Sequence, residues 1–143
     1  LDVKVLEHSS IHRIAELSET CRLEIIGGFT SSALGEPHIY DAEEVDQLNL
    51  IGATTDAAPT DETPAGFVVP YAVRPVADGG RLPKTYKAHT YTQLRKVIAD
   101  GVDFKLTRLQ KFNDKRTFIM TYCDTMEKIH AVTWDSIDIV PTI

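Results

Sequence analysis

The sequence predicts a mainly helical α+β fold with two N-terminal helices, a small β-hairpin, one long C-terminal helix and a short capping helix. Apolar residues recur at steps of three and four across residues 91–122, a span without proline, which is typical of a long helix. Two runs of strand-forming residues flank the turn Asp78-Gly79-Gly80, which indicates a hairpin. The 143 residues are 43% hydrophobic and 25% charged, so we expect one folded domain over residues 1–143.

The first predicted helix covers residues 10–26 and belongs to an N-terminal connector over residues 1–28. Ser9 or Ser10 is suited to cap it, because a hydroxyl accepts hydrogen bonds from the free N–H groups of a first turn. Gly27-Gly28 is expected to end it, because glycine adopts the left-handed conformation without penalty.

The second predicted helix begins at Asp41, which forms a capping-box spacing with Glu44. Val45, Leu48 and Ile51 give this helix a single apolar stripe. The acidic, proline-rich run 52–66 has no apolar periodicity and is predicted to be an exposed loop. Before this helix, His38-Ile39-Tyr40 is predicted to be a short extended segment.

The predicted hairpin pairs residues 67–73 with residues 82–89. Pro70 and Pro75 lack an N–H group, so the first strand is predicted to be an edge strand or a broken one. A lone hairpin is marginal in water, so it must pack on a helix.

The long predicted helix runs from Tyr91 to about Tyr122 and is opened by a capping box of Thr90 and Gln93. A break near Asn113-Asp114 is the alternative, because an unbroken helix of this length exceeds a compact domain of this size. Its apolar stripe, predicted to be core, consists of Leu94, Ile98, Val102, Leu109, Phe112 and Ile119.

Several residues of this helix lie off the stripe or interrupt it, and we predict that they meet another subunit or a partner. Lys105 and Arg116 interrupt the stripe. Burial of an unpaired cation is costly, so each is expected to contact a carboxylate or to lie in solvent. A short helix is predicted from Thr125 to about His130, because Asp124 and Glu127 have the spacing of a capping box. An extended apolar tail over residues 135–143 is expected to follow it. The predicted interface residues are Val97, Phe104, Lys105, Arg116, Phe118 and Trp134.

The sequence shows no constellation typical of an enzyme, and we expect no catalytic residue, no cofactor and no metal. His8 and His12 share a helix face, but zinc needs three or four ligands and no HExxH or CxxC pattern accompanies them. Cys123 lacks the flanking signature of a catalytic thiol, and Cys21 and Cys123 are expected to be free thiols. The glycine pairs do not precede helices as phosphate-binding loops do.

Charge is strongly segregated along the chain, whose formal net charge is −6. Acidic residues dominate 1–80 and basic residues dominate 81–116. The basic span contains aromatic residues and could bind nucleic acid, but an acidic partner within the chain or in a neighbouring subunit accounts for it more simply. No apolar run reaches the eighteen residues of a membrane helix, so membrane insertion is not expected.

Three blocks of the sequence resemble a domain family of unknown function found in bacteriophage and prophage tail-fibre proteins. The first is GGFTSSALGEPHIYDAEEVDQLNLIGA, the second HTYTQLRKVIADGVDFKLTRLQ and the third YCDTMEKIHAVTW. The positions that carry the resemblance are Gly28, Phe29, Tyr40, Asp46, Gln47, Asn49, Leu50, His89, Thr90, Gln93 and Trp134.

The resemblance implies that residues 29–134 form a tail-protein-like domain with no catalytic residues to carry over. It implies a non-enzymatic structural component of a phage tail, in a fibre or its baseplate attachment, that is made in the host cytoplasm and located in the virion. A homotrimer is preferred and a homodimer is next, with other tail proteins as further partners. The alternatives are a tail-fibre assembly chaperone and a module that binds a host-surface glycan or receptor.

Overall fold

The computed structural model describes residues 2–142 and confirms the α+β class. It contains four α-helices, among them the long predicted helix, and a four-stranded antiparallel sheet in place of a lone hairpin. The elements in chain order are α1 (Val3–Ile26), β1 (Phe29–Ser31), β2 (His38–Tyr40), α2 (Glu44–Ala57), β3 (Val69–Pro75), the 3-10 helix η1 (Ala77–Gly80), β4 (Thr85–His89), α3 (Tyr91–Tyr122) and α4 (Met126–Ala131).

The chain divides into two compact units, which are described separately. Unit 1 consists of Leu1–Glu24 and Leu106–Ile143, and unit 2 consists of Ile25–Lys105. Helix α3 contributes residues 91–105 to unit 2 and residues 106–122 to unit 1. That residues 1–143 form one domain stays a prediction.

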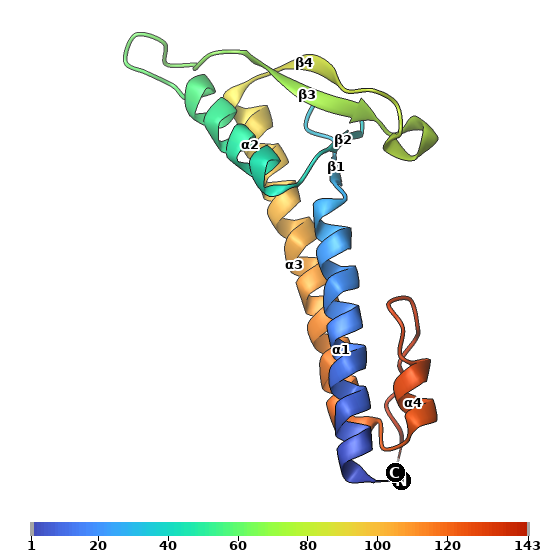
Figure 1. Cartoon of the computed structure of the whole chain (residues 1–143). Helices are drawn as coiled ribbons and strands as arrows, with labels where there is room; N and C mark the ends of the chain where they lie inside the picture. Colours follow the sequence, from blue (N-terminus) through green and yellow to red (C-terminus); the bar gives the residue numbers. More distant parts are fainter. Residues whose placement is uncertain (1, 143) are drawn as a thin grey trace. The chain divides into compact units, whose positions relative to one another are not determined.

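Unit 2 is built on the sheet, whose strand order is β1-β2-β3-β4. The hairpin of β3 and β4 pairs Val69 with His89 and Val73 with Thr85. The predicted extended segment His38–Tyr40 is β2, which pairs with β1 along its whole length. His38 and Ile39 also pair with Pro75 and Arg74, at the C-terminal end of β3. Figure 1 shows the chain leaving the C-terminal end of α2 and returning into β3.

The core of unit 2 lies between the sheet, α2 and the first turns of α3. Phe29 and Tyr40 stack with their ring centroids 5.8 Å apart, and Tyr71 stacks on the other side of Tyr40 at 6.2 Å. Such aromatic contacts stabilise the core beyond what the buried area of each ring contributes. The buried members of this core are Phe29, Tyr40, Ala42, Leu50, Ala57, Val73, Leu94 and Val97.

Two predicted helix starts are wrong, for reasons visible in the first turns. Helix α1 begins at Val3, where the Asp2 carboxylate accepts from the Lys4 N–H at 2.9 Å, so Ser9 and Ser10 lie inside the helix. Helix α2 begins at Glu44 because Asp41 bonds to basic partners of the sheet, and Asp46 accepts from the Glu43 N–H at 3.0 Å instead. Helix α2 also extends to Ala57, into the predicted loop.

Helix α3 matches its prediction from Tyr91 to Tyr122 and is continuous through Asn113. The Thr90–Gln93 capping box is confirmed, since the Thr90 N–H donates to Gln93 Oε1 at 2.8 Å and the Gln93 N–H to Thr90 Oγ1 at 3.2 Å. None of the helices within residues 2–142 is long and apolar enough to cross a membrane.

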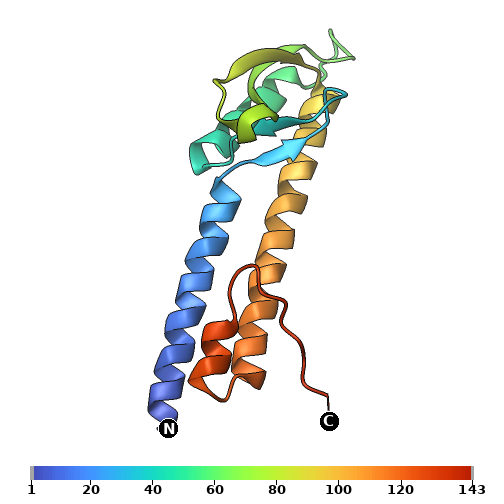
Figure 2. The same cartoon turned by 90° about the vertical axis from the view of Figure 1, so that its right-hand side faces the viewer.

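Unit 1 contains most of α1, the second half of α3, α4 and the segment that follows α4. In Figure 2, α4 is drawn between the lower ends of α1 and α3. Helix α4 is capped by Thr125, whose hydroxyl accepts from the Lys128 N–H at 3.2 Å, rather than by Asp124 as predicted. Apart from one lysine, the buried side chains of unit 1 are Leu17, Cys21, Ile119, Ile129, Val132 and Trp134.

Candidate interaction surfaces

The most chemically suggestive group in unit 2, His89 with Tyr40, is part of the core. His89 is fully buried; its Nδ1 is 2.7 Å from the Lys87 carbonyl oxygen, and its Nε2 is 2.7 Å from Tyr40 Oη. A carbonyl only accepts, so Nδ1 carries the hydrogen and the neutral ring accepts from the Tyr40 hydroxyl at Nε2. Burial lowers the pKa of His89 and raises that of Tyr40 to about 12, which favours this neutral pair. The pair is therefore suited to fixing the core.

A second polar group of unit 2 joins the start of α2 to the hairpin. Asp41 accepts from Arg74 Nε at 3.0 Å and lies 2.7 Å from Lys84 Nζ. The hydrogen bond from Arg74 is the main reason that the pKa of Asp41 lies below its usual range. The two cations outnumber the carboxylate, so this end of unit 2 carries no free negative charge from Asp41.

An apolar cleft of about 210 Å3 opens between α2 and α3 within unit 2. Phe29 forms its floor, against Gly101 of α3, where an added Cβ would lie 2.9 Å from the Phe29 ring. Glycine at this position therefore lets the ring lie against the helix backbone. Ile51 and Val102 border the cleft and are 57% and 53% exposed, so its rim remains apolar and open to solvent.

The apolar stripe of α2 lies on the solvent side of the helix. Val45, Leu48 and Ile51 are 57%, 64% and 57% exposed, whereas Leu50 and Ala57 are buried. The buried side of α2 also carries the half-buried Asp46, Ala53 and Thr54, so the spacing of apolar residues does not mark it. An apolar stripe left exposed beside an apolar cleft is typical of a surface that binds another protein.

The predicted core stripe of α3 is only partly buried within the chain. Leu94 and Ile119 are nearly inaccessible, and Ile98 packs partly against the core. Val102 and Leu109 are more than 40% exposed, so their own chain does not bury them, and burial at the symmetry axis of an oligomer stays a prediction. Phe112 is half-buried in unit 1.

The predicted interface residues fall into buried and exposed groups. Val97 is fully buried and Trp134 is 8% exposed, so both are corrected to core positions, because each unit covers them with its own side chains. Phe104 is half-buried against Phe29, with ring centroids 6.3 Å apart. The remaining three reach the surface of their units, with Lys105 and Arg116 exposed and Phe118 half-buried.

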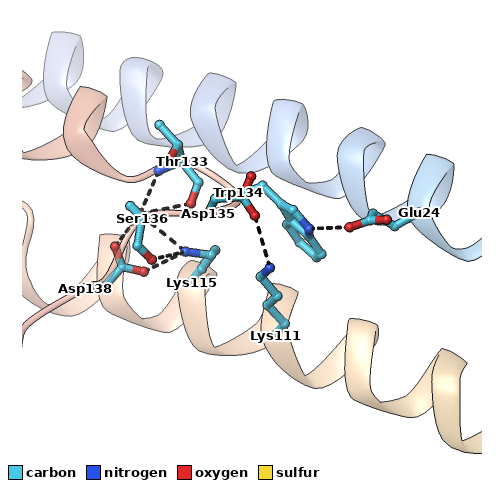
Figure 3. Close-up of polar contacts among 8 residues, drawn as sticks. All are labelled: Glu24, Lys111, Lys115, Thr133, Trp134, Asp135, Ser136 and Asp138. Atoms are coloured by element: carbon cyan, nitrogen blue, oxygen red, sulfur yellow. Dashed lines mark hydrogen bonds and ion pairs between the residues drawn. The ribbon is translucent and has the colours of Figure 1, made fainter. Parts of the chain in front are cut away.

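Trp134 holds the segment after α4 against both long helices of unit 1 (Figure 3). Its indole N–H donates to Glu24 Oε1 of α1 at 2.9 Å, and Lys111 Nζ of α3 lies 4.4 Å from the ring centroid. The ring is therefore held from two sides, by a carboxylate at its edge and a cation at its face.

Lys115 is the buried cation of α3, at 4% exposure (Figure 3). Its Nζ donates to the Ser136 carbonyl oxygen and to Asp138 Oδ2, each at 3.0 Å. Ser136 Oγ also lies 2.7 Å from Asp138 Oδ1, which fixes the carboxylate. Arg116 was the predicted interface residue, although Lys115 lies three residues after Phe112 and four before Ile119 and therefore also falls on the stripe.

The histidines and thiols show no arrangement for chemistry. His8 and His12 are both exposed in unit 1, and within residues 2–142 no three potential metal ligands are grouped to hold an ion. Cys21 is buried and Cys123 half-buried, and both are free. Burial raises the pKa of each thiol, which disfavours the nucleophilic thiolate.

Comparison of this chain with protein families, with curated proteins and with solved structures finds no match.

Proposed function

We propose that this chain is a non-enzymatic structural component of a bacteriophage tail, in a fibre or its attachment to the baseplate, and that it assembles through the exposed apolar surface of unit 2. That surface consists of Val45, Leu48, Ile51 and Val102 with the cleft beside the last two. The observation that carries the proposal is the outward apolar stripe of α2.

The composition of this surface supports assembly over catalysis. Branched aliphatic side chains lie next to a cleft, and Lys105 lines it at one end. Helix α2 carries Glu44 and Asp46 in its first turn. A second copy could therefore offer acidic groups to the basic end of the cleft, in addition to apolar area. This complementarity favours self-association, and the resemblance to tail-fibre proteins makes the homotrimer preferred and the homodimer next.

The phage setting is supported by the three blocks of resemblance. Their positions include residues with structural roles in unit 2: Phe29 and Tyr40 stack in the core, and Thr90 with Gln93 caps α3. A domain of this kind suits a virion protein, with other tail proteins as partners.

Light scattering coupled to size-exclusion chromatography tests the assembly. We expect a mass that is a multiple of 15.9 kDa at tens of micromolar, and a shift toward 15.9 kDa in Ile51→Glu and Val102→Glu. Thr92→Glu is the matched control, because it adds the same charge at an exposed position of unit 2 that lies outside the stripe of α2 and outside the cleft. A native chain of 15.9 kDa, or equal dissociation by the control, would contradict the proposal.

Mass spectrometry of purified virions tests the setting. A structural component is retained in fixed stoichiometry with the other tail proteins. Detection only in tail-fibre assembly intermediates would contradict a structural role and assign the chain to the assembly chaperones.

A further inference from the structure

Part of β3 has a strand partner on one side only. Residues 69–73 pair with β4, and on the opposite side β2 pairs only with Arg74 and Pro75. Within residues 2–142, no strand covers the other edge of residues 69–73. In an antiparallel pair, alternate residues direct their N–H and C=O groups away from the partner. This edge is therefore an open hydrogen-bonding edge, apart from the missing N–H group of Pro70.

Helix α2 borders this open edge and is fixed to the strand region at both of its ends. The Tyr71 hydroxyl donates to the Asp46 carbonyl oxygen at 3.1 Å, near the start of the helix. The Phe67 N–H donates to the Ala57 carbonyl oxygen at 3.0 Å, at its end. These two hydrogen bonds, at opposite ends of α2, hold the helix at a set distance from β3. The space between α2 and β3 therefore cannot close by a simple sliding of the helix.

The space between helix and strand is an open groove of about 460 Å3, here called the edge groove. All five residues from Val69 to Val73 line it. Because successive side chains of a strand point to opposite faces, a groove lined by five consecutive residues must border the strand's edge. Gly52 and Ala53 form the middle of the helical wall, and an added Cβ at Gly52 would meet nothing within 4 Å.

The charge of the edge groove differs between its walls. Asp46 and Asp56 lie on the α2 wall, one near each end of the helix. On the strand side, Arg74 and Lys84 are engaged by Asp41. The acidic groups of the helical wall therefore favour a ligand with a basic side chain.

We propose that the edge groove binds an extended peptide segment with at least one lysine or arginine, which adds as a strand to the open edge of β3 beneath α2. Backbone pairing supplies the affinity, and the acidic helical wall selects the basic side chain. The small residues of α2 leave room for the side chains that point to the helix. This site borders the apolar surface through which the chain is proposed to assemble and shares Leu48 with it, whereas Gly52, Asp56 and the residues of β3 line the groove alone.

A glycan is the competing class of ligand, because Tyr86 is 75% exposed and lines the same groove. Its ring lies on the same side of the sheet as Ala72, with which it pairs, and could stack on a sugar. The peptide is favoured because the strand edge offers a row of backbone groups, apart from the missing N–H of Pro70, which an added strand matches.

Selection from a displayed library of random decapeptides tests the proposal, with synthesis of the enriched peptides and measurement of their affinity by fluorescence anisotropy. We expect enrichment of peptides with lysine or arginine. Gly52→Leu should weaken the binding of these peptides at least tenfold, because the leucine side chain fills open space in the groove. Leucine also favours the helix, so the substitution should not unfold α2. Thr55→Leu is the matched control and should bind as the native chain does. Asp56→Asn should weaken binding about threefold to tenfold, and only for peptides with a basic residue.

Backbone methylation of the peptide separates strand addition from side-chain binding alone. N-methyl groups at alternate positions should abolish binding, and the bound peptide should protect amides of β3 from hydrogen exchange. The proposal would be overturned if none of the enriched peptides bound more weakly to Gly52→Leu. It would also be overturned if methylated peptides bound as well as unmethylated ones. A glycan on an array that binds the native chain but not Gly52→Leu, with no peptide bound, would assign the groove to sugars and overturn it as well.

Discussion

Replacement of Lys115 by methionine is expected to destabilise unit 1 more than any change to its exposed charges. The residue is 4% exposed, and its Nζ is the common donor to Ser136 and Asp138. Methionine retains the length of the apolar stem, so packing along α3 changes little. The variant therefore isolates the loss of the cation.

The magnitude follows from what the substitution leaves behind. Removal of one partner of a buried ion pair costs about 3–5 kcal/mol, because the other charge stays buried without compensation. The Asp138 side chain is 15% exposed and keeps its 2.7 Å hydrogen bond with Ser136 Oγ. Both features reduce the cost, so we expect a loss of about 3 kcal/mol, the lower end of that range.

The only tryptophan of the chain reports on this region. Trp134 is two residues from Ser136 and bonds to Glu24 of α1, so its fluorescence should follow the unfolding of unit 1 in urea. Far-UV circular dichroism should be recorded alongside, because two units need not unfold in one transition.

A double-mutant cycle distinguishes the ion pair from packing. Asp138→Asn in the Lys115→Met background should cost less than in the native chain, with a coupling of about 1–3 kcal/mol. Lys128→Met, which removes an exposed cation from α4 in unit 1, is the control and should change stability by less than about 1 kcal/mol. A stability loss below about 0.5 kcal/mol for Lys115→Met, or additive effects in the cycle, would refute the reasoning.

Two further predictions concern titratable groups. Because the pKa of His89 in the folded chain lies below its ordinary value, the unfolded chain binds the proton first as pH drops. The free energy of unfolding should therefore fall below about pH 6.5, by at most about 1.4 kcal/mol per pH unit. Urea titrations of His89→Gln should show a shallower dependence of this free energy on pH between pH 7.5 and 5.5, and an unchanged dependence would count against the neutral ring. Cys123 should react with a thiol reagent before Cys21 in the native chain and both should react in urea, whereas absence of a thiol titre in urea would indicate a disulfide.

The elements predicted best from sequence are those whose signals are local. Thr90 and Gln93 satisfy each other across one turn, and no proline interrupts α3 after them, so its bounds depend on neighbouring residues alone. The start of α2 was misplaced because Asp41 satisfies the capping spacing but is bound by Arg74, which is far away in the sequence. A capping motif does not reveal such competition from a distant cation.

The surfaces were harder to predict because periodicity identifies an apolar side but not its neighbour. The stripe Val45, Leu48 and Ile51 was identified correctly as apolar, yet it is exposed. The edge groove had only one signal in the sequence, the prolines of β3, which indicated an edge strand without showing what lies beside it. Strand order and the position of α2 depend on contacts between distant segments, which one sequence does not specify.

The two sides of α2 differ in chemistry in a way that suits two kinds of binding. Toward the apolar cleft, Ile51 offers aliphatic area, whose burial stabilises an assembly without regard to direction. Toward β3, Gly52 and Asp56 line a groove beside open backbone groups, which impose direction and register on a ligand. The first surface is suited to a lasting contact between copies, which excludes water from a broad area. The second is suited to an exchangeable segment, so the two sides of one helix suit different kinds of contact, with Leu48 bordering both.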